Sequence, residues 1–213
     1  MGPKIVSIEG NIGAGKTTIF NKLRLENTDP NIIFVQEPVN QWLSFRDSVS
    51  KETILSAYYK EQEKYSFPFQ IMALLTRLTL LKNTIEANPC AKLIITERSL
   101  QSDYAIFVRM LYESQKMDTI LYSIYCQIHK DYVAFDLDGI IFINTDSLTS
   151  YERCALRNRD GEKIALQYLR TCDKYHYEWL HSIKVPILTM SSDYNQAQLF
   201  SIHSFLQQIM IKR

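Results

Sequence analysis

A short glycine-rich segment near the start of the chain has the residue types and spacing of a phosphate-binding loop. Four residues separate Gly10 from Gly15-Lys16-Thr17, and the segment comes directly after an apolar run. Glycines let the backbone curl so that successive N–H groups point at anionic oxygens. A helix starting near the lysine adds its positive end, the lysine reaches the β- and γ-phosphates, and the threonine hydroxyl binds Mg²⁺. The predicted nucleotide-binding residues of this loop are Gly10, Asn11, Ile12, Gly13, Ala14, Gly15, Lys16, Thr17 and Thr18.

Charged residues also follow two other apolar runs. Glu37 is predicted to accept a proton from a substrate hydroxyl as that oxygen attacks the γ-phosphorus. The alternative is a carboxylate that caps the turn before Pro38. Glu97 and Arg98 stand at the end of a buried run, where adjacent opposite charges are rare without a partner. Glu97 is predicted to bind Mg²⁺ and Arg98 to bind phosphate oxygens or the attacking hydroxyl; an internal ion pair is the alternative.

A third cluster is rich in arginine. Arg153 and Arg157 are four residues apart and therefore share a helix face, and Arg159 and Glu162 follow them. Like charges at that spacing repel, so we expect an anion between the arginines. Phosphate fits, because arginine neutralises charge during phosphoryl transfer. The segment of about 153–163 resembles a mobile lid, and the alternative is a solvated basic loop.

The segment 65–70 joins bulky aromatic side chains to one amide. The Gln70 amide has both a donor and an acceptor, which can bind the edge of a base. On spacing alone, an aromatic helix start that packs into the core is the favoured interpretation.

The elements that must position these residues form a regular alternation. Runs that are apolar almost throughout are typical of parallel strands buried on both faces. The alternation predicts an α/β fold with a five-stranded parallel sheet, helices on both faces, and a ligand site at the carboxyl ends of the strands. With no linker or repeat, we expect one domain over 1–213. The expected strands are 5–9, 32–36, 93–96, 139–144 and 186–190, and the expected helices lie near 16–25, 52–64, 69–88, 101–115, 118–130, 147–157, 164–182 and 195–210.

Composition excludes several classes of function. The 24 basic and 23 acidic residues nearly balance, so no basic tract predicts a nucleic-acid partner. No apolar stretch has the length of a membrane span, so no membrane partner is expected. The 4 cysteines are scattered, which argues against zinc and for reduced thiols. No signal or transit peptide precedes the first predicted strand, so we expect a cytoplasmic protein, with a nuclear one as the alternative.

Together these motifs resemble the deoxynucleoside kinase family over essentially the whole chain, from Ile8-Glu9-Gly10-Asn11-Ile12 to the strand at 186–189. The length resembles the compact viral members. The resemblance implies a P-loop kinase fold with an arginine-rich lid. It also implies ATP as donor, Mg²⁺, and transfer of the γ-phosphate to the 5′-hydroxyl of a deoxyribonucleoside in nucleotide salvage.

The resemblance also implies roles for individual residues. Glu37 is the general base on the 5′-hydroxyl, with Arg98 beside the same oxygen. Tyr59 and Glu162 hold the sugar 3′-hydroxyl, and Gln70 makes paired hydrogen bonds to the base. Phe69 and Phe107 sandwich the base, while Trp42, Val39, Ile12 and Leu55 line the pocket. Arg153, Arg157 and Arg159 clamp the donor phosphates, and Tyr194 lies against the donor base. The loop at Tyr194 is shorter than in the family, and the lid is one residue shorter after Glu162.

Base preference is predicted from Arg77 and Asp103. Arg77 lies two helical turns after Gln70, so both side chains face one side. This combination resembles the cytosine- and purine-accepting members, because an Arg–Asp pair fills the space that a thymine methyl needs. We therefore expect deoxycytidine and purine deoxynucleosides ahead of thymidine, with a thymidine-preferring or broad-specificity enzyme as the alternative.

Two other functions remain open at this point. A nucleoside monophosphate kinase shares the loop, but its anionic acceptor would sit badly against Glu37. A nucleotide-binding subunit without catalysis is argued against by Glu37, Arg98 and the lid arginines. The resemblance further implies a homodimer through the helices near 69–88 and 101–115, and feedback inhibition by a deoxynucleoside triphosphate.

Overall fold

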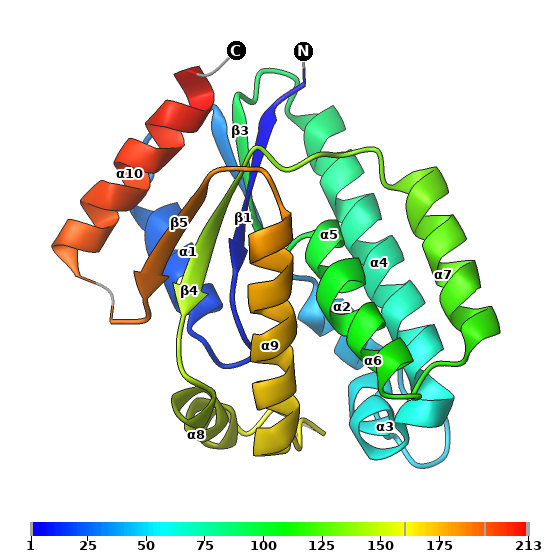
Figure 1. The fold of residues 1–213 in the computed structure, drawn as a ribbon. Helices are drawn as coiled ribbons and strands as arrows, with labels where there is room; N and C mark the ends of the chain where they lie inside the picture. Colours follow the sequence, from blue (N-terminus) through cyan, green and yellow to red (C-terminus); the bar gives the residue numbers. More distant parts are fainter. Residues whose placement is uncertain (1, 160, 194, 212–213) are drawn as a thin grey trace.

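The computed structural model describes residues 2–159, 161–193 and 195–211. Within these residues, five parallel strands form one sheet in the order β2-β3-β1-β4-β5 (Figure 1). The strands are β1 (Lys4–Glu9), β2 (Ile32–Val35), β3 (Leu93–Glu97), β4 (Gly139–Asn144) and β5 (Ile187–Ser191). The predicted α/β fold with a five-stranded parallel sheet is confirmed, and each strand lies within one residue of its expected bounds.

Alternate residues of the strands face two separate hydrophobic layers. Val6 and Ile8 of β1 pack with α1 and α10, whereas Ile5 packs with α4, α7 and α9 on the other face. This two-sided burial explains why the strands are apolar in nearly every position, since each residue meets a helix layer whichever way it points.

The helices follow the expected alternation with three differences. Their bounds are α1 (Lys16–Glu26), α2 (Val39–Ser44), α3 (Ile54–Lys60), α4 (Gln62–Ala87), α5 (Leu100–Ser102), η1 (Asp103–Val108), α6 (Arg109–Glu113), α7 (Thr119–Tyr132), α8 (Ser147–Arg157), α9 (Leu166–Ser182) and α10 (Gln196–Ile211). Helix α2 was not predicted, because six residues are too few to establish a helical period.

Helix α4 begins earlier than the sequence predicts. It starts at Gln62, ends at Ala87, and contains Pro68 in its second turn. Pro68 is the seventh residue of the helix and lies beyond the first four N–H groups, which have no partner within a helix, so α4 continues through it with one backbone hydrogen bond fewer. The predicted helix start at residue 69 was therefore wrong, and the segment 65–70 lies inside the helix.

The predicted helix at 101–115 is instead three short pieces. The middle piece, η1 (Asp103–Val108), is a π-helical turn between α5 and α6. Such turns insert an extra residue into the helical repeat and often occur at functional sites. Asp103 and Phe107, both predicted substrate residues, belong to it.

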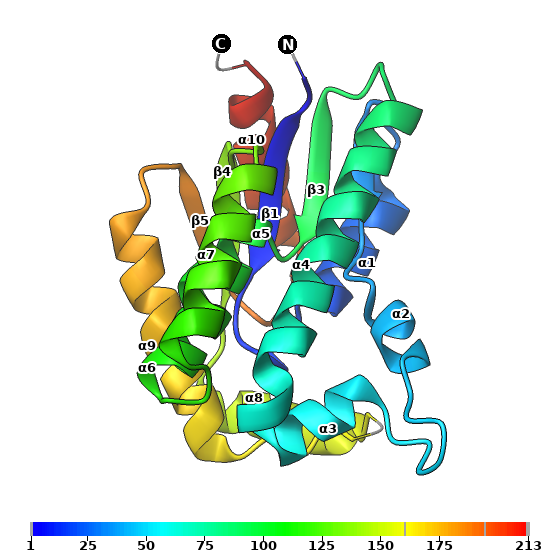
Figure 2. The same ribbon diagram turned by 90° about the vertical axis from the view of Figure 1, so that its right-hand side faces the viewer.

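The carboxyl ends of the strands meet at one end of the molecule, where α3 and α8 lie (Figures 1 and 2). The start of β1 and the end of α10 lie at the opposite end. The predicted site is therefore at the end where α3, α8 and the loops after β1, β2 and β3 converge. Among the described residues, none of the helices combines the length and apolar character that crossing a bilayer requires.

Candidate active site

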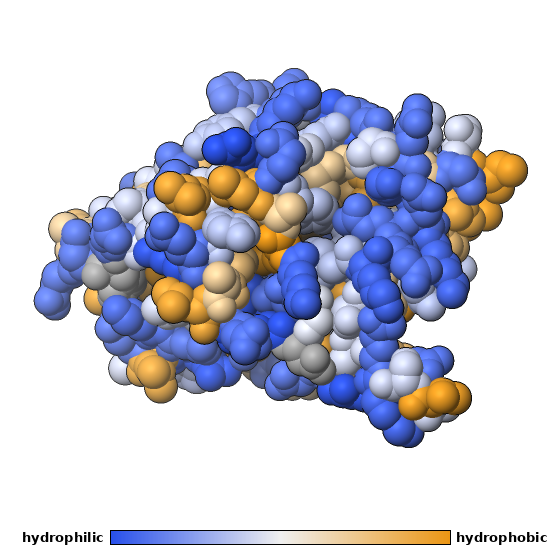
Figure 3. All heavy atoms as spheres, turned by 90° about the horizontal axis from the view of Figure 1, so that it is seen from below, coloured by the Kyte–Doolittle hydropathy of each residue, from blue (hydrophilic) through white to orange (hydrophobic). Residues whose placement is uncertain are grey.

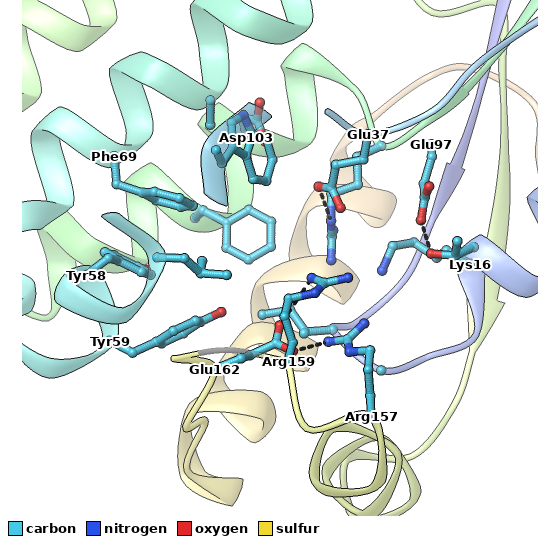
Figure 4. A pocket seen from close by; sticks show the side chains of 18 of the residues that line it. Lys16, Glu37, Tyr58, Tyr59, Phe69, Glu97, Asp103, Arg157, Arg159 and Glu162 are labelled. Atoms are coloured by element: carbon cyan, nitrogen blue, oxygen red, sulfur yellow. Dashed lines mark hydrogen bonds and ion pairs between the residues drawn. The ribbon is translucent and has the colours of Figure 1, made fainter. Parts of the chain in front are cut away.

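A cavity of about 370 Å³ opens at the carboxyl end of the sheet. Figure 4 shows phosphate-loop and strand-end residues on one side and aromatic residues of α3 and α4 on the other. Its lining includes Ile12, Gly13, Gly15, Lys16, Thr17, Thr18, Glu37, Trp42, Leu55, Tyr58, Tyr59, Phe69, Gln70, Ala73, Arg77, Glu97, Arg98, Asp103, Phe107, Arg153, Arg157, Arg159, Glu162 and Tyr168. Most predicted site residues are therefore brought together, although they come from segments throughout the chain.

A few predicted residues do not line the cavity. Gly10, Asn11 and Ala14 belong to the phosphate loop but lie behind its inner surface, and Val39 packs against the core. Tyr194, predicted against the donor base, lies outside the described residues.

The phosphate loop has the conformation that its glycines permit. Gly13 has a φ of +82°, and a Cβ there would stand 2.3 Å from the Ser150 carbonyl oxygen and 2.8 Å from Cys154 Sγ of α8. The close approach of α8 therefore requires glycine at this position. Lys16 begins α1, and its Nζ donates to the carbonyl oxygens of Gly10 at 3.1 Å and Asn11 at 2.7 Å.

The lysine ammonium is buried among charges of both signs. Burial, and after it the positive charge of Arg98, lowers the pKa of Lys16 to about 7, although three carboxylates oppose the shift. An anion entering the loop would restore the charge of this side chain.

Thr17 and Glu97 form a pair beside Lys16. The Thr17 hydroxyl donates to Glu97 Oε1, and burial followed by repulsion from Glu37 raises the pKa of Glu97. A hydroxyl and a carboxylate are oxygen donors of the kind that Mg²⁺ prefers. In the described part of the chain, no group of three or more His, Cys, Asp or Glu could hold a metal ion. The Thr17 hydroxyl and the Glu97 carboxylate therefore suit a Mg²⁺ ion whose other ligands include phosphate oxygens.

Glu37 lies among arginines at the centre of the cavity. Its Oε1 is 2.5 Å from Arg77 Nη2 and 3.7 Å from Arg98 Nε. Burial alone would raise the pKa of Glu37, but Arg77, Arg98 and Lys16 together lower it to about 2. The carboxylate is therefore ionised. The turn before Pro38 uses the Glu37 backbone carbonyl, which accepts from the Val39 N–H at 2.9 Å, so the turn-capping alternative does not describe the side chain.

The alternative of an ion pair between Glu97 and Arg98 does not describe the Arg98 side chain. Its guanidinium pairs with Glu37 and lies 4.0 Å from Glu9 Oε2, while Glu97 binds Thr17. The Arg98 backbone has a φ of +65°, in the left-handed region that non-glycine residues adopt uncommonly. This turn at the end of β3 directs Arg98 and Glu97 to different partners.

Arg77 connects two carboxylates. Its Nε donates to Asp103 Oδ2 at 2.8 Å while its Nη2 reaches Glu37. The expected Arg77–Asp103 pair is thus present, and the same arginine also holds Glu37. The second contact was not predicted, because Glu37 and Arg77 are 40 residues apart in the sequence.

The aromatic side of the cavity surrounds Gln70. Phe69 stacks on Tyr58 with ring centroids 4.6 Å apart, and its edge meets Trp42 at 5.7 Å. The Arg98 guanidinium lies over the Phe107 ring, with its Cζ 4.8 Å from the ring centroid. The packing interpretation of segment 65–70 is therefore half right: Phe69 belongs to the core, and both Phe69 and Gln70 also line the cavity.

The predicted lid segment is folded back on itself. Arg157 Nη2 is 2.5 Å from Glu162 Oε2, and Arg159 Nη1 is 3.5 Å from Glu162 Oε1. The Glu162 side chain is only 2% exposed, so this is not a solvated basic loop. Arg153 instead donates to the Ala14 carbonyl oxygen at 3.5 Å. Glu162 thus pairs with both Arg157 and Arg159, and the binding of a phosphate between Arg153 and Arg157 stays a prediction.

Two tyrosines of the cavity were missed at the sequence level. The hydroxyls of Tyr58 on α3 and Tyr168 on α9 are 2.8 Å apart. The Tyr59 hydroxyl is directed toward Glu162 and Arg159 (Figure 4). The tyrosine pair at 58–59 is visible in the sequence, but nothing there connects it to a residue 110 positions away.

The fold and site define a class of protein. A parallel sheet with a phosphate loop after its central strand, and an ionised carboxylate in the same cavity, is the arrangement of a P-loop kinase. A family model for deoxynucleoside kinase matches residues 6–211. The chain belongs to the deoxynucleoside kinase family and is a phosphotransferase.

Individual relatives agree with this assignment. A probable deoxycytidine kinase of fowlpox virus is 32% identical over 199 residues, covering 89% of this chain and 79% of the relative. Human deoxycytidine kinase is 33% identical over 218 residues, covering 88% and 83%. A mitochondrial thymidine kinase 2 from Macaca fascicularis is 28% identical over 208 residues, covering 93% and 74%. Deoxynucleoside phosphorylation is the activity that these relatives share by name.

Proposed function

We propose that this protein transfers the γ-phosphate of ATP to the 5′-hydroxyl of deoxyribonucleosides, with deoxycytidine and purine deoxynucleosides preferred over thymidine. The observation that carries the proposal is the position of Glu37. An ionised carboxylate in a cavity that also contains Lys16 and Gln70 suits a neutral acceptor hydroxyl. A monophosphate acceptor would bring a second anion against Glu37 and fits this site less well.

The donor side of the mechanism is charge neutralisation. The loop N–H groups and Lys16 bind the β- and γ-phosphates, and Arg153, Arg157 and Arg159 approach from α8 and its following loop. Arg157 and Arg159 must first leave Glu162, so phosphate binding frees that carboxylate. Thr17 and Glu97 would hold Mg²⁺, which would supply positive charge against the charge that develops on the transferred phosphoryl group.

The acceptor side is positioning. Glu37 accepts a hydrogen bond from the 5′-hydroxyl and takes its proton, while Arg98 lies beside the same oxygen. Tyr59 and the freed Glu162 hold the 3′-hydroxyl, and Gln70 binds the base between Phe69 and Phe107. Alignment of the two reacting groups supplies most of the rate, since phosphoryl transfer needs little covalent assistance from the protein.

The base preference rests on the Arg77–Asp103 pair. With its guanidinium held at 2.8 Å by Asp103, Arg77 occupies space near Gln70 that a thymine methyl would need. Relatives named for deoxycytidine and for thymidine both match this chain, so the preference is a separate prediction from the family.

A steady-state panel tests both parts. Purified protein is assayed with ATP and Mg²⁺ against the four deoxynucleosides and against dCMP and TMP, by coupled ADP detection. We expect the highest kcat/KM with deoxycytidine or a purine deoxynucleoside. The highest value with thymidine would overturn the preference, and turnover of monophosphates alone would overturn the acceptor class.

A double substitution tests the steric argument. Arg77→Met with Asp103→Ala should raise the ratio of thymidine to deoxycytidine kcat/KM. Because Arg77 also holds Glu37, the absolute rate should fall with every substrate, so the ratio is the informative quantity. An unchanged ratio would refute the argument.

A further inference from the structure

A carboxylate outside the cavity joins the phosphate loop to the helix that carries the first lid arginines. Asp173, in the second turn of α9, uses its two oxygens for two different elements. Oδ1 accepts from Asn11 Nδ2 at 2.6 Å, and Oδ2 accepts from the Ser147 hydroxyl. These partners are 162 and 26 residues away in sequence. No motif predicts this bridge.

Its first partner, Asn11, fixes the phosphate loop. Asn11 is buried; its Nδ2 also donates to the Leu169 carbonyl oxygen at 2.9 Å, and its Oδ1 accepts from the Ile12 N–H at 2.8 Å. The Asn11 backbone carbonyl accepts from Lys16 Nζ at 2.7 Å. Asn11 therefore links Asp173 to Lys16, because its side chain binds the Asp173 carboxylate and its backbone carbonyl binds the lysine.

Its second partner, Ser147, begins α8. About two turns later, α8 carries Arg153, whose guanidinium reaches the Ala14 carbonyl oxygen of the phosphate loop. Ser150 and Cys154 of the same helix pack against Gly13. Contact between α8 and the loop is so close that a small shift of the helix start would move its arginines relative to the phosphate site.

We infer that Asp173 is a positioning residue for the donor nucleotide: it holds the phosphate loop and α8 in one fixed relation. The inference rests on the proposed function, in which the loop and the α8 arginines bind ATP. A carboxylate is needed because two donors point at one side chain. An amide has a single acceptor oxygen and would turn an N–H toward one of them.

The test is Asp173→Asn in the full chain, with ATP affinity by calorimetry and KM for both substrates. We expect the KM and Kd for ATP to rise by about five-fold or more, as for loss of a hydrogen bond to a charged group. KM for deoxynucleoside should stay within about two-fold, because Asp173 does not contact that part of the cavity. Ser147→Ala, which removes one arm, should give a smaller rise in the same direction.

Asp146→Ala is the matched control. Asp146 caps α8 through Thr149, one residue from Ser147, but does not contact the loop. Asp146→Ala should lower the melting temperature, and any rise in the KM for ATP should be smaller than with Asp173→Asn, because the bridge from Asp173 to the phosphate loop and to Ser147 is retained. An Asp173→Asn protein with unchanged ATP affinity, or with the KM values for ATP and deoxynucleoside raised alike, would overturn the inference. If Asp173→Asn does not fold, Ser147→Ala decides: unchanged ATP affinity refutes the bridge.

The proposed function and the positioning role of Asp173 can be refuted independently of each other. Absence of phosphoryl transfer by the unmodified protein would reject the proposed function. ATP binding by calorimetry would still measure what Asp173 does.

Discussion

The pKa of Glu37 constrains how this carboxylate acts. At about 2, it is too weakly basic to remove a proton from a free hydroxyl before reaction begins. It can orient the hydroxyl and accept the proton late, as the oxygen bonds to phosphorus and becomes acidic. The arginines that lower its pKa are then also the groups that keep it ionised and aligned.

This account predicts the effect of Glu37→Gln. The amide retains the size of the side chain but accepts no proton, so kcat should fall by about 100-fold or more, with a much smaller change in the KM for nucleoside. Steady-state kinetics measures both. Glu63→Gln, at an exposed pair with Lys116, serves as control and should leave both unchanged. Near-normal turnover of Glu37→Gln would remove Glu37 from the mechanism.

Lys16 predicts a pH dependence of ATP binding. With a pKa of about 7 in the free protein, most Lys16 side chains are neutral at pH 8. Binding phosphate requires the charged form, so ATP binding at pH 8 should take up about one proton, and affinity should decline as pH rises above about 7.

Calorimetry in buffers with different ionisation enthalpies measures this uptake. At pH 6 Lys16 is already charged, and uptake by this group should be near zero. Equal proton uptake at pH 6 and pH 8 would contradict the assignment.

At the scale of elements, the lid loop is seated on α3 by close backbone contact. Gly161 has a φ of +76°, and a Cβ there would stand 2.2 Å from Ser56 Cβ. Glu162 follows directly, so this contact places the carboxylate beside Tyr59. Helix α3, which bears the proposed sugar-binding residue Tyr59, thus supports the loop that bears the proposed phosphate-binding residue Arg159.

Gly161→Ala should therefore disturb both substrates. Positive φ alone costs about 1–2 kcal/mol for alanine, and the overlap with Ser56 adds to it. We expect kcat/KM to fall by about ten-fold or more. Ser56→Gly in the same protein should recover part of the loss by removing the overlapping atoms. Gly2→Ala, with nothing within 4 Å, is the control. Full activity of Gly161→Ala would show that the loop is not seated in this way during turnover.

At the scale of the whole molecule, the surface has two contrasting faces. The end that carries α3 and α8 is largely hydrophilic, with apolar side chains in small separate groups (Figure 3). On the outer side, α4 and α7 lie next to each other (Figures 1 and 2) and expose Leu75 (44%), Ile120 (73%) and Ile124 (42%). The segment 101–115, predicted to form a dimer interface with 69–88, is largely buried beneath them, with Ile106, Val108 and Leu111 in the core.

The homodimer stays a prediction, and the exposed apolar side chains of α7 favour this helix over 101–115 as the partner of α4 in its interface. We expect α4 and α7 to pair with the same helices of a second copy, because adjacent exposed apolar side chains are typical of such interfaces. Ile124→Arg with Leu75→Arg should convert the dimer to a monomer in light scattering after gel filtration. Leu25→Arg, on the distant helix α1, should not. A monomeric unmodified protein would reject the proposal.

The phosphate loop, the strand alternation and most of the residues that line the cavity can be predicted from the amino-acid sequence alone. These follow from local patterns: a loop needs its glycines at fixed spacing, and buried strands need continuous apolar runs. Which charged side chains contact one another depends on the three-dimensional fold. Arg77 reaching Glu37, Glu162 occupying Arg157 and Arg159, and Asp173 joining Asn11 to Ser147 all connect distant segments. The π-helical turn of η1 and the passage of α4 through Pro68 depend on the fold too, because packing on neighbouring elements overrides local preference.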